Sequence, residues 1–251
     1  MSRTTQPSWL IEEPYVEVPL GMLRPGKEAQ IELVRRIGDN DASCLLVHKR
    51  YVPRKVGAKG ELEAMGVQRA SAFRHDVEYR EGRQFRKTRD RRAVERMSSY
   101  GRQLLQSRWT GHEFQVMRVL WEAGVNVPYP VSYAEDIFIL EYVGAEDGAA
   151  PQLARAKLDS RQLEVAAAQM VTGLEAIVAT GWVHGDLSAY NLLWWDEQLW
   201  FIDFPQALDL AANPQGLNYL HRDVLNVSQW FSAKGLVLDG EDLFAQLLTQ
   251  L

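Results

Sequence analysis

The 251-residue sequence is long enough to bury a substantial core, either as one large domain or as two packed lobes. Its 46% hydrophobic and 24% charged residues are typical of a globular protein, and no apolar run reaches the roughly 18 residues of a membrane span. These features exclude a transmembrane protein. The net charge of −5 is unevenly distributed, because lysines and arginines outnumber acids by more than two to one between Arg50 and Arg108.

Two further features predict a cytoplasmic protein. The single cysteine, Cys44, cannot form an internal disulfide, which is typical of a reducing compartment. The first residues, Met1 to Trp9, are polar and lack the basic start and apolar stretch of a secretory signal.

The first half of the chain begins with three predicted strands, Tyr15 to Leu20, Ala29 to Arg36 and Ser43 to Arg50, the last two joined by a turn. Residues from about 50 to 108 have little apolar periodicity and many arginines. This pattern predicts a flexible basic insertion, with a short helix around Asp90 to Leu105.

After the insertion, apolar spacing predicts a helix from Thr110 to Gly124, followed by an extended segment containing two prolines. Ile137 to Val143 has the composition of a buried strand. The polar segment Gly144 to Pro151 then changes the composition, so we place a lobe boundary there, between residues 1–143 and 144–251.

The second half is predicted to be mostly helical. Asp159 or Ser160 can cap a long helix that ends near Thr180. Two short strands follow, at Leu192 to Trp194 and Leu199 to Ile202. Two further helices are predicted, one from Asn213-Pro214 to about Ala233 and one capped by Asp239 that ends at Leu248.

The clearest chemical signal is the run from His184 to Asn191, followed after a short hairpin by Asp203. In a kinase-type catalytic loop, an aspartate accepts or orients the substrate hydroxyl, an asparagine five positions later binds metal, and a further aspartate holds magnesium. Asp186, Asn191 and Asp203 have these spacings, so we predict Asp186 and Asp203 as catalytic residues and Asn191 and Asp203 as metal ligands. His184 is interpreted as a structural residue that bonds to the backbone near Asp203.

Lys49 lies at the end of the third strand, where a kinase places the lysine that contacts the nucleotide phosphates. Its predicted partner is Glu113 on the following helix, because a carboxylate would keep the lysine charged and in position. Between the first two strands, Gly26, Lys27, Glu28 and Ala29 form a candidate phosphate-binding loop whose glycine lets backbone amides approach a phosphate.

Together these motifs resemble those of the RIO-type atypical protein kinases. The loop Gly26 to Ala29 is similar to that family's phosphate-binding loop, His184 to Asn191 to its catalytic loop, and Ile202 to Gln206 to its metal-binding motif. Trp109 to Pro130 and Tyr219 to Val224 add to the resemblance, which extends from about Gly26 to Gly235.

The resemblance implies an α+β fold, a reduced bilobal protein kinase with an antiparallel sheet and a helix in the N-lobe and a mostly helical C-lobe. It implies a serine kinase, an ATPase or both, using ATP with Mg²⁺ or Mn²⁺, with adenine bound by backbone groups of Glu141 and Val143. Gly185 stands where many protein kinases have an arginine, which argues against regulation through a phosphorylated activation loop.

Two alternatives stay open at this point. Aminoglycoside-type phosphotransferases share the His-Gly-Asp-Leu motif, the asparagine and the Ile-Asp-Phe motif, although Gln206 and the Gly26 to Ala29 loop argue against them. The chain is alternatively a nucleotide-dependent module that docks on ribosomal particles with little turnover. The basic insertion is in either case a candidate contact for ribosomal RNA. The competing interpretation is a loop that is solvated or that pairs with the protein's own acidic surface in an autoinhibitory way.

Overall fold

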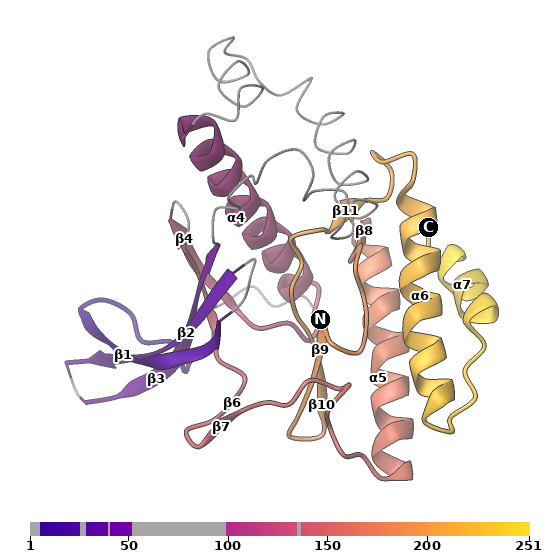
Figure 1. Cartoon of the computed structure of the whole chain (residues 1–251), viewed down its shortest axis with the longest axis horizontal. Helices are drawn as coiled ribbons and strands as arrows, with labels where there is room; N and C mark the ends of the chain where they lie inside the picture. Colours follow the sequence, from indigo (N-terminus) through magenta and orange to yellow (C-terminus); the bar gives the residue numbers. More distant parts are fainter. Residues whose placement is uncertain (1–5, 26–28, 40, 52–98, 135–136) are drawn as a thin grey trace, which may run out of the picture.

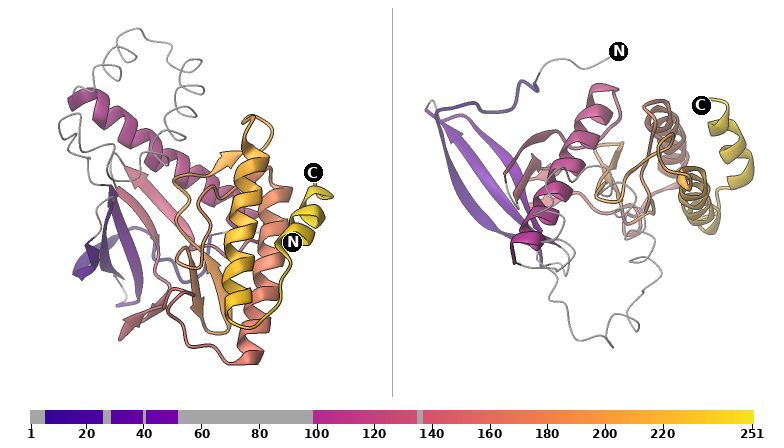
Figure 2. Two further views of the ribbon diagram at one scale, coloured as in Figure 1. Left: turned by 45° about the vertical axis from the view of Figure 1, so that its right-hand side comes forward. Right: turned by 90° about the horizontal axis from the view of Figure 1, so that it is seen from above.

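The computed structural model describes residues 6–25, 29–39, 41–51, 99–134 and 137–251. A sheet lies on one side of the long helix α4 (Ser99–Glu122), and the remaining helices lie on the other side (Figures 1 and 2). Over these described ranges, no helix combines the length and the apolar character that a bilayer crossing requires.

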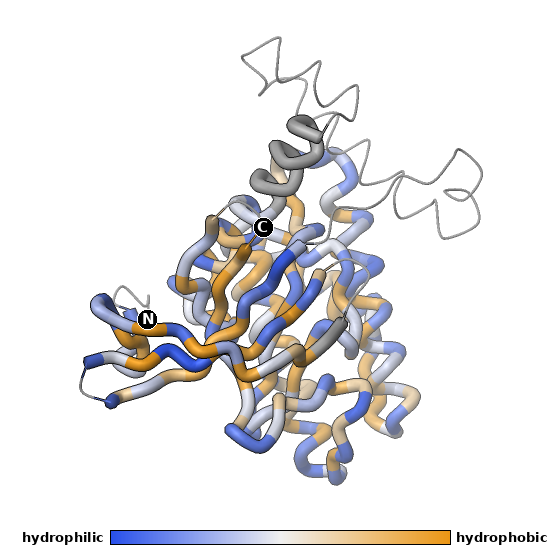
Figure 3. Tube along the Cα trace, turned by 60° about the vertical axis from the view of Figure 1, so that its left-hand side comes forward, coloured by the Kyte–Doolittle hydropathy of each residue, from blue (hydrophilic) through white to orange (hydrophobic). Residues whose placement is uncertain are grey.

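The sheet is antiparallel, with strand order β1-β2-β3-β5-β4. Apolar stretches mark several strands of this sheet (Figure 3), and the buried side chains on its inner strands include Val34, Leu46 and Phe138. The prediction of the first strand is too short, because β1 continues past Pro19 and Gly21 through two register shifts against β2. The strand bounds are β1 (Tyr15–Pro25), β2 (Ala29–Gly38), β3 (Ser43–Tyr51), β4 (Pro130–Ala134) and β5 (Ile137–Glu141).

Helix α4 is one continuous element, which corrects the predicted boundary at Thr110. The predicted short helix is right over Ser99 to Leu105, and the residues between it and Thr110 are helical too, so the two predicted helices are one. Ser99 to Arg108 lack an apolar stripe but contain mainly good helix formers, so propensity and continuity join the two predicted helices. Residues 90–98 of the predicted short helix lie outside the described residues.

The helical half follows the prediction closely. Asp159 caps α5 (Ser160–Ala179) through a capping box with Gln162, and Asp239 caps α7 (Gly240–Leu248). Helix α6 (Gly216–Ala233) begins two residues after the predicted Pro214, and its N-cap residue makes no side-chain capping bond. One apolar core joins α4 and β5 to α5, α6 and α7.

Short strands fix the loops that carry the motifs. Residues 184–191 connect β8 (Trp182–Val183) to β9 (Leu192–Trp195), and residues 202–207 connect β10 (Gln198–Phe201) to β11 (Leu208–Asp209). The β9–β10 hairpin was predicted, whereas β8 and β11 are too short to be found from periodicity. A second small hairpin, β6 (Gly144–Ala145) with β7 (Gly148–Ala149), lies within the predicted linker.

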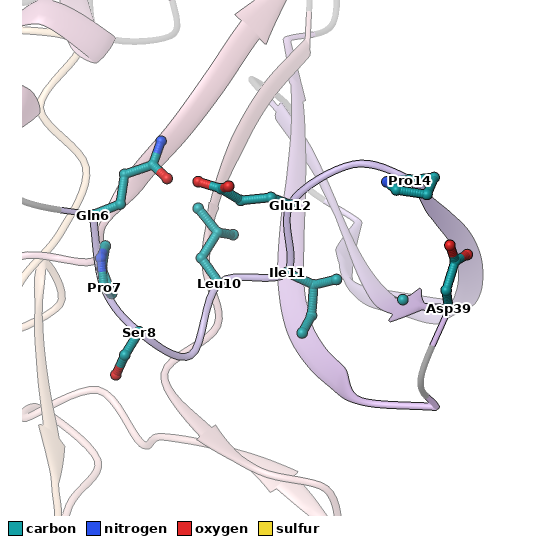
Figure 4. A pocket seen from close by; sticks show the side chains of 9 residues that line it. Gln6, Pro7, Ser8, Leu10, Ile11, Glu12, Pro14 and Asp39 are labelled. Carbon is teal, nitrogen blue, oxygen red and sulfur yellow. The ribbon is translucent and has the colours of Figure 1, made fainter.

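Residues 6–14 fasten the N-terminus to the sheet. The buried guanidinium of Arg36 donates to the Ile11 carbonyl at 3.2 Å and to Glu17 at 2.8 and 2.9 Å. The same segment and the turn at Asp39 line an open groove of about 530 Å³ (Figure 4). Its lining residues include none of the predicted site residues: Gln6, Pro7, Ser8, Leu10, Ile11, Glu12, Pro14, Gly38 and Asp39.

Candidate active site

The predicted partners Lys49 and Glu113 meet in the structure. The Lys49 Nζ lies 2.8 and 3.1 Å from the two carboxylate oxygens of Glu113, although 64 positions separate the residues in the chain. Both are buried, with Glu113 at 0% and Lys49 at 7% exposure. Burial acts to lower the pKa of Lys49, but the carboxylates of Asp203 and Glu113 overcome it and raise the pKa well above its ordinary value.

Asp203 joins this pair from the loop after β10. Its Oδ1 lies 2.6 Å from Lys49 Nζ, and its side chain is 46% exposed. Its backbone has a φ of 69°, an unusual conformation for a residue with a Cβ. The next residue is held as well, because the Phe204 N–H donates to Glu113 Oε1 at 3.0 Å.

The catalytic-loop residues are tied to each other and to the metal loop. The Asn191 Nδ2 donates to the Asp186 carbonyl at 2.8 Å. The Ile202 N–H donates to the Asn191 carbonyl at 3.0 Å, which links the loop to the residue before Asp203. The structure therefore brings together the three residues that the motif spacing selected.

His184 is a neutral structural residue, as the sequence interpretation proposed. Burial lowers its pKa to about 4, so the ring is uncharged near neutral pH. Its Nε2–H donates to the Ile202 carbonyl at 3.0 Å, and its Nδ1 accepts from the Asp186 N–H at 3.4 Å. One nitrogen donates and the other accepts, which is what a neutral imidazole offers.

Asp223 of α6 is a site-supporting residue to which sequence reasoning assigned no role. Its carboxylate, 1% exposed, accepts the backbone N–H of Gly185 at 2.7 Å and of Leu187 at 3.0 Å, on either side of Asp186. Burial raises its pKa to about 7 against the opposing effect of these amide bonds. An available signal was an acidic residue on the buried face of a helix, next to Val224.

The structure gives a steric reason for glycine at position 185. Gly185 has a φ of +81°, and a Cβ there would lie 2.3 Å from the carbonyl oxygen of Gln206. Any side chain would separate the catalytic loop from the metal loop. An arginine at this position is therefore incompatible with the packing.

The predicted nucleotide-binding residues are only partly described. Gly26, Lys27 and Glu28 lie outside the described residues, while Ala29 starts β2 opposite Tyr51. Glu141 ends β5, where its N–H donates to the Tyr129 carbonyl at 2.9 Å. The carbonyl of Val143, just beyond, accepts from the Ala150 N–H at 3.0 Å.

Two apolar residues that neighbour Lys49 in the sheet, Ile31 and Val47, were given no role from the sequence. Ile31 pairs directly with Lys49, and Val47 precedes the lysine by two positions. Residues in these relations share one face of a sheet. The alternation of side chains along the strand places Val47 on the same face as Lys49, and this pattern could have been found in the sequence.

Comparison with known proteins places the chain in a family. A family model described as the RIO domain matches residues 68–243. The chain belongs to the RIO family. The family and the kinase-like α+β fold predicted from the motifs are thus confirmed.

Curated relatives agree with this assignment. The chain is 32% identical over 135 residues to the RIO-type serine/threonine-protein kinase Rio1 of Thermoplasma acidophilum, covering 54% of this chain and 69% of the relative. It is 28% identical over 235 residues to the protein of the same name from Haloferax volcanii, covering 94% and 70%. The human serine/threonine-protein kinase RIO3 is 30% identical over 158 residues, 62% of this chain but 30% of its own length.

Membership of the RIO family supports an atypical kinase that uses ATP and a divalent metal. These matches do not favour either alternative, the aminoglycoside-type phosphotransferase or the ribosome-docking module with little turnover.

A double-mutant cycle tests the coupling of Lys49 and Glu113. Lys49→Met alone leaves a buried carboxylate without its cation, so we expect a loss of unfolding free energy of about 3–5 kcal/mol. Glu113→Gln in that background should recover part of the loss, and the effects on kcat/KM for ATP should be less than additive. Chemical denaturation and steady-state kinetics on the four proteins measure both quantities.

The exposed pair Arg118 and Glu122, 3.0 Å apart on the same helix, provides the control. Its cycle of Arg118→Met and Glu122→Gln should give a coupling of about 0.5 kcal/mol or less, because solvent screens it. Strict additivity for Lys49 and Glu113 would contradict the coupling.

A pH series tests the burial of Asp223. Its pKa is raised in the folded protein to about 7 from 3.8, so the folded state keeps this proton after the unfolded chain has lost it. The resulting stabilisation is complete below pH 4 and disappears as pH rises towards 7, by at most about 4 kcal/mol. The unfolding free energy of the wild type minus that of Asp223→Asn should therefore fall over this interval.

Chemical denaturation between pH 4 and 7.5 measures this difference. His184 has the opposite slope over the same interval, because its folded pKa is lowered, but both proteins retain it and its contribution cancels. A difference that is constant with pH would show that Asp223 titrates alike in the folded and unfolded states.

Proposed function

We propose that this chain is an ATP-dependent serine/threonine protein kinase of RIO type that transfers the γ-phosphate of ATP to protein, to water or to both. The observation that carries the proposal is the convergence of Lys49, Glu113 and Asp203 beside the loop that holds Asp186 and Asn191. A lysine, a helix carboxylate and a metal-binding aspartate are the parts that phosphoryl transfer by kinases requires.

In this proposal Asp186 orients the acceptor hydroxyl and accepts its proton. Asn191 and Asp203 would hold Mg²⁺ or Mn²⁺, which would neutralise charge on the phosphates. The residues fit such an ion, because the Asn191 nitrogen bonds to the Asp186 carbonyl and its oxygen is the atom available as a ligand. The half-exposed carboxylate of Asp203 supplies a second hard oxygen.

For the nucleotide, we propose that Lys49 contacts the phosphates and that Ile31 and Val47 cover one face of the adenine. The Glu141 N–H and the Val143 carbonyl bond within the protein. We propose that adenine binds backbone groups of Glu141 and Val143, at the end of β5 and just beyond it. The loop of Gly26, Lys27, Glu28 and Ala29 would complete the phosphate site.

The nucleotide would then lie between two lobes, residues 1–143 and 144–251, a division that we propose on the change in composition at Gly144. We also propose a cytoplasmic location. Its support is the free thiol of Cys44, the chain's single cysteine.

Transfer of labelled γ-phosphate tests the assignment. Asp186→Asn should preserve folding and much of the ATP affinity while lowering kcat by about 10²–10⁴, because it removes a catalytic carboxylate rather than a binding contact. Asp203→Ala should abolish metal-dependent turnover. The matched control is Asp196→Asn in the exposed β9–β10 turn, which should leave turnover unchanged. Wild-type turnover in Asp186→Asn would rule out its assigned role.

We also propose that the basic insertion contacts a polyanion such as ribosomal RNA. The support is the charge of the sequence, in which basic residues crowd one stretch: Arg80, Arg83, Arg86, Lys87, Arg89, Arg91 and Arg92. These residues lie outside the described residues, so the proposal depends on their charge alone.

Binding of structured RNA across a salt series tests this proposal. Neutralising Arg89, Arg91 and Arg92 to glutamine should weaken binding and reduce the salt slope by up to about three contacts' worth. Neutralising three exposed basic residues elsewhere, Arg155, Lys157 and Lys234, provides the control. Equal slopes and affinities for the wild type and the first triple variant would eliminate this cluster as an RNA contact.

A further inference from the structure

The carboxylate of Glu113 has a bonding partner that the kinase chemistry does not account for. Lys49 contacts both of its oxygens, and the Phe204 N–H donates to Oε1. The hydroxyl of Tyr51 donates to Oε2 from a position 62 residues away in the chain. Three donors from two segments thus surround one fully buried carboxylate.

The position of Tyr51 on β3 explains this contact. It follows Lys49 by two residues, so strand alternation directs both side chains to the same face of the sheet. Tyr51 is 7% exposed, and the Lys49 Nζ lies 5.1 Å from the centre of its ring. Burial and then the neighbouring Glu113 raise the pKa of Tyr51 well above its ordinary value, so the phenol keeps its proton and donates.

The bond matters because Glu113 positions two other groups. Its carboxylate holds the lysine that also contacts Asp203, and it holds the backbone directly after Asp203. A carboxylate that loses one of its donors keeps the same charge but has fewer constraints on its orientation. A rotation of Glu113 would move Lys49 and the metal loop together.

We propose that Tyr51 is a positioning residue for phosphoryl transfer, which fixes the orientation of the Glu113 carboxylate and through it the placement of Lys49 and Asp203. The proposal rests on the proposed kinase function. It assigns to β3 two donors for a single carboxylate, a cation at Lys49 and a neutral hydroxyl at Tyr51.

Tyr51→Phe tests the proposal, because it removes the hydroxyl and keeps the ring. We expect kcat/KM for ATP to fall roughly tenfold, as the loss of a hydrogen bond to a charged group implies. The decisive readout is the same substitution in a Glu113→Gln background, measured by single-turnover phosphate transfer. There it should change the rate by about twofold or less, because the group that Tyr51 positions is already altered.

The control is Tyr129→Phe, which removes the hydroxyl of another buried tyrosine, 2% exposed, whose ring packs against Trp9 and Trp121. It should leave kcat/KM unchanged. Thermal unfolding of every variant separates loss of folded protein from loss of rate. An effect of Tyr51→Phe that is equal in both Glu113 backgrounds, or absent in both, would overturn the proposal.

If Tyr51→Phe fails to fold, a fluorinated tyrosine at position 51 replaces it, since this residue keeps the ring and hydroxyl but has a more acidic phenol. Its hydroxyl is a stronger donor to the same carboxylate, so kcat/KM for ATP should change with Glu113 present and should change by about twofold or less in the Glu113→Gln background. An equal change in both Glu113 backgrounds, or no change in either, would overturn the proposal. An inactive wild type would instead refute the kinase function itself.

Discussion

The buried carboxylate of Glu113 is the group on which the arrangement of the site depends. Glu113 is fully excluded from solvent on α4, and an uncompensated carboxylate there would cost several kcal/mol. Its compensation comes from two other elements, the cation of Lys49 on β3 and the N–H of Phe204 in the metal loop. The Glu113 carboxylate on α4 therefore holds β3 and the metal loop close to the helix. Asp203, the residue before Phe204, is thereby placed next to Lys49.

The catalytic loop is held by a second buried carboxylate, that of Asp223 on α6. Asp223 accepts the backbone N–H groups on either side of Asp186, so the loop conformation is fixed through its backbone and the Asp186 side chain takes no part in that contact. Close packing of the two loops requires a residue without a Cβ at Gly185. Two buried acids, Glu113 and Asp223, thus position the two loops that carry Asp186, Asn191 and Asp203.

The sequence predicts site residues that lie close together in the chain. It does not predict residues whose role depends on tertiary contacts. Asp186 and Asn191 are five positions apart, so a motif identifies them. Lys49 and Glu113 are 64 positions apart, and strand-then-helix order with kinase precedent paired them. Asp223 lay within the stretch Tyr219 to Val224 that resembles the family but was given no role, and Tyr51 was not singled out at all. The role of a buried acid in a helix or of a tyrosine on a strand becomes clear only when its partners are known.

Two adjacent residues of α4 fix the orientation of the helix against the loop after β10. His112 bonds to the Ala207 carbonyl at 2.9 Å, and the Glu113 carboxylate accepts from the Phe204 N–H at 3.0 Å. These bonds end in backbone groups of Phe204 and Ala207, two residues whose side chains are buried in the core. The helix is therefore positioned by its own contacts with this loop. Gly185 packs against the carbonyl of Gln206, the residue before Ala207, so the same short loop contacts both α4 and the catalytic loop.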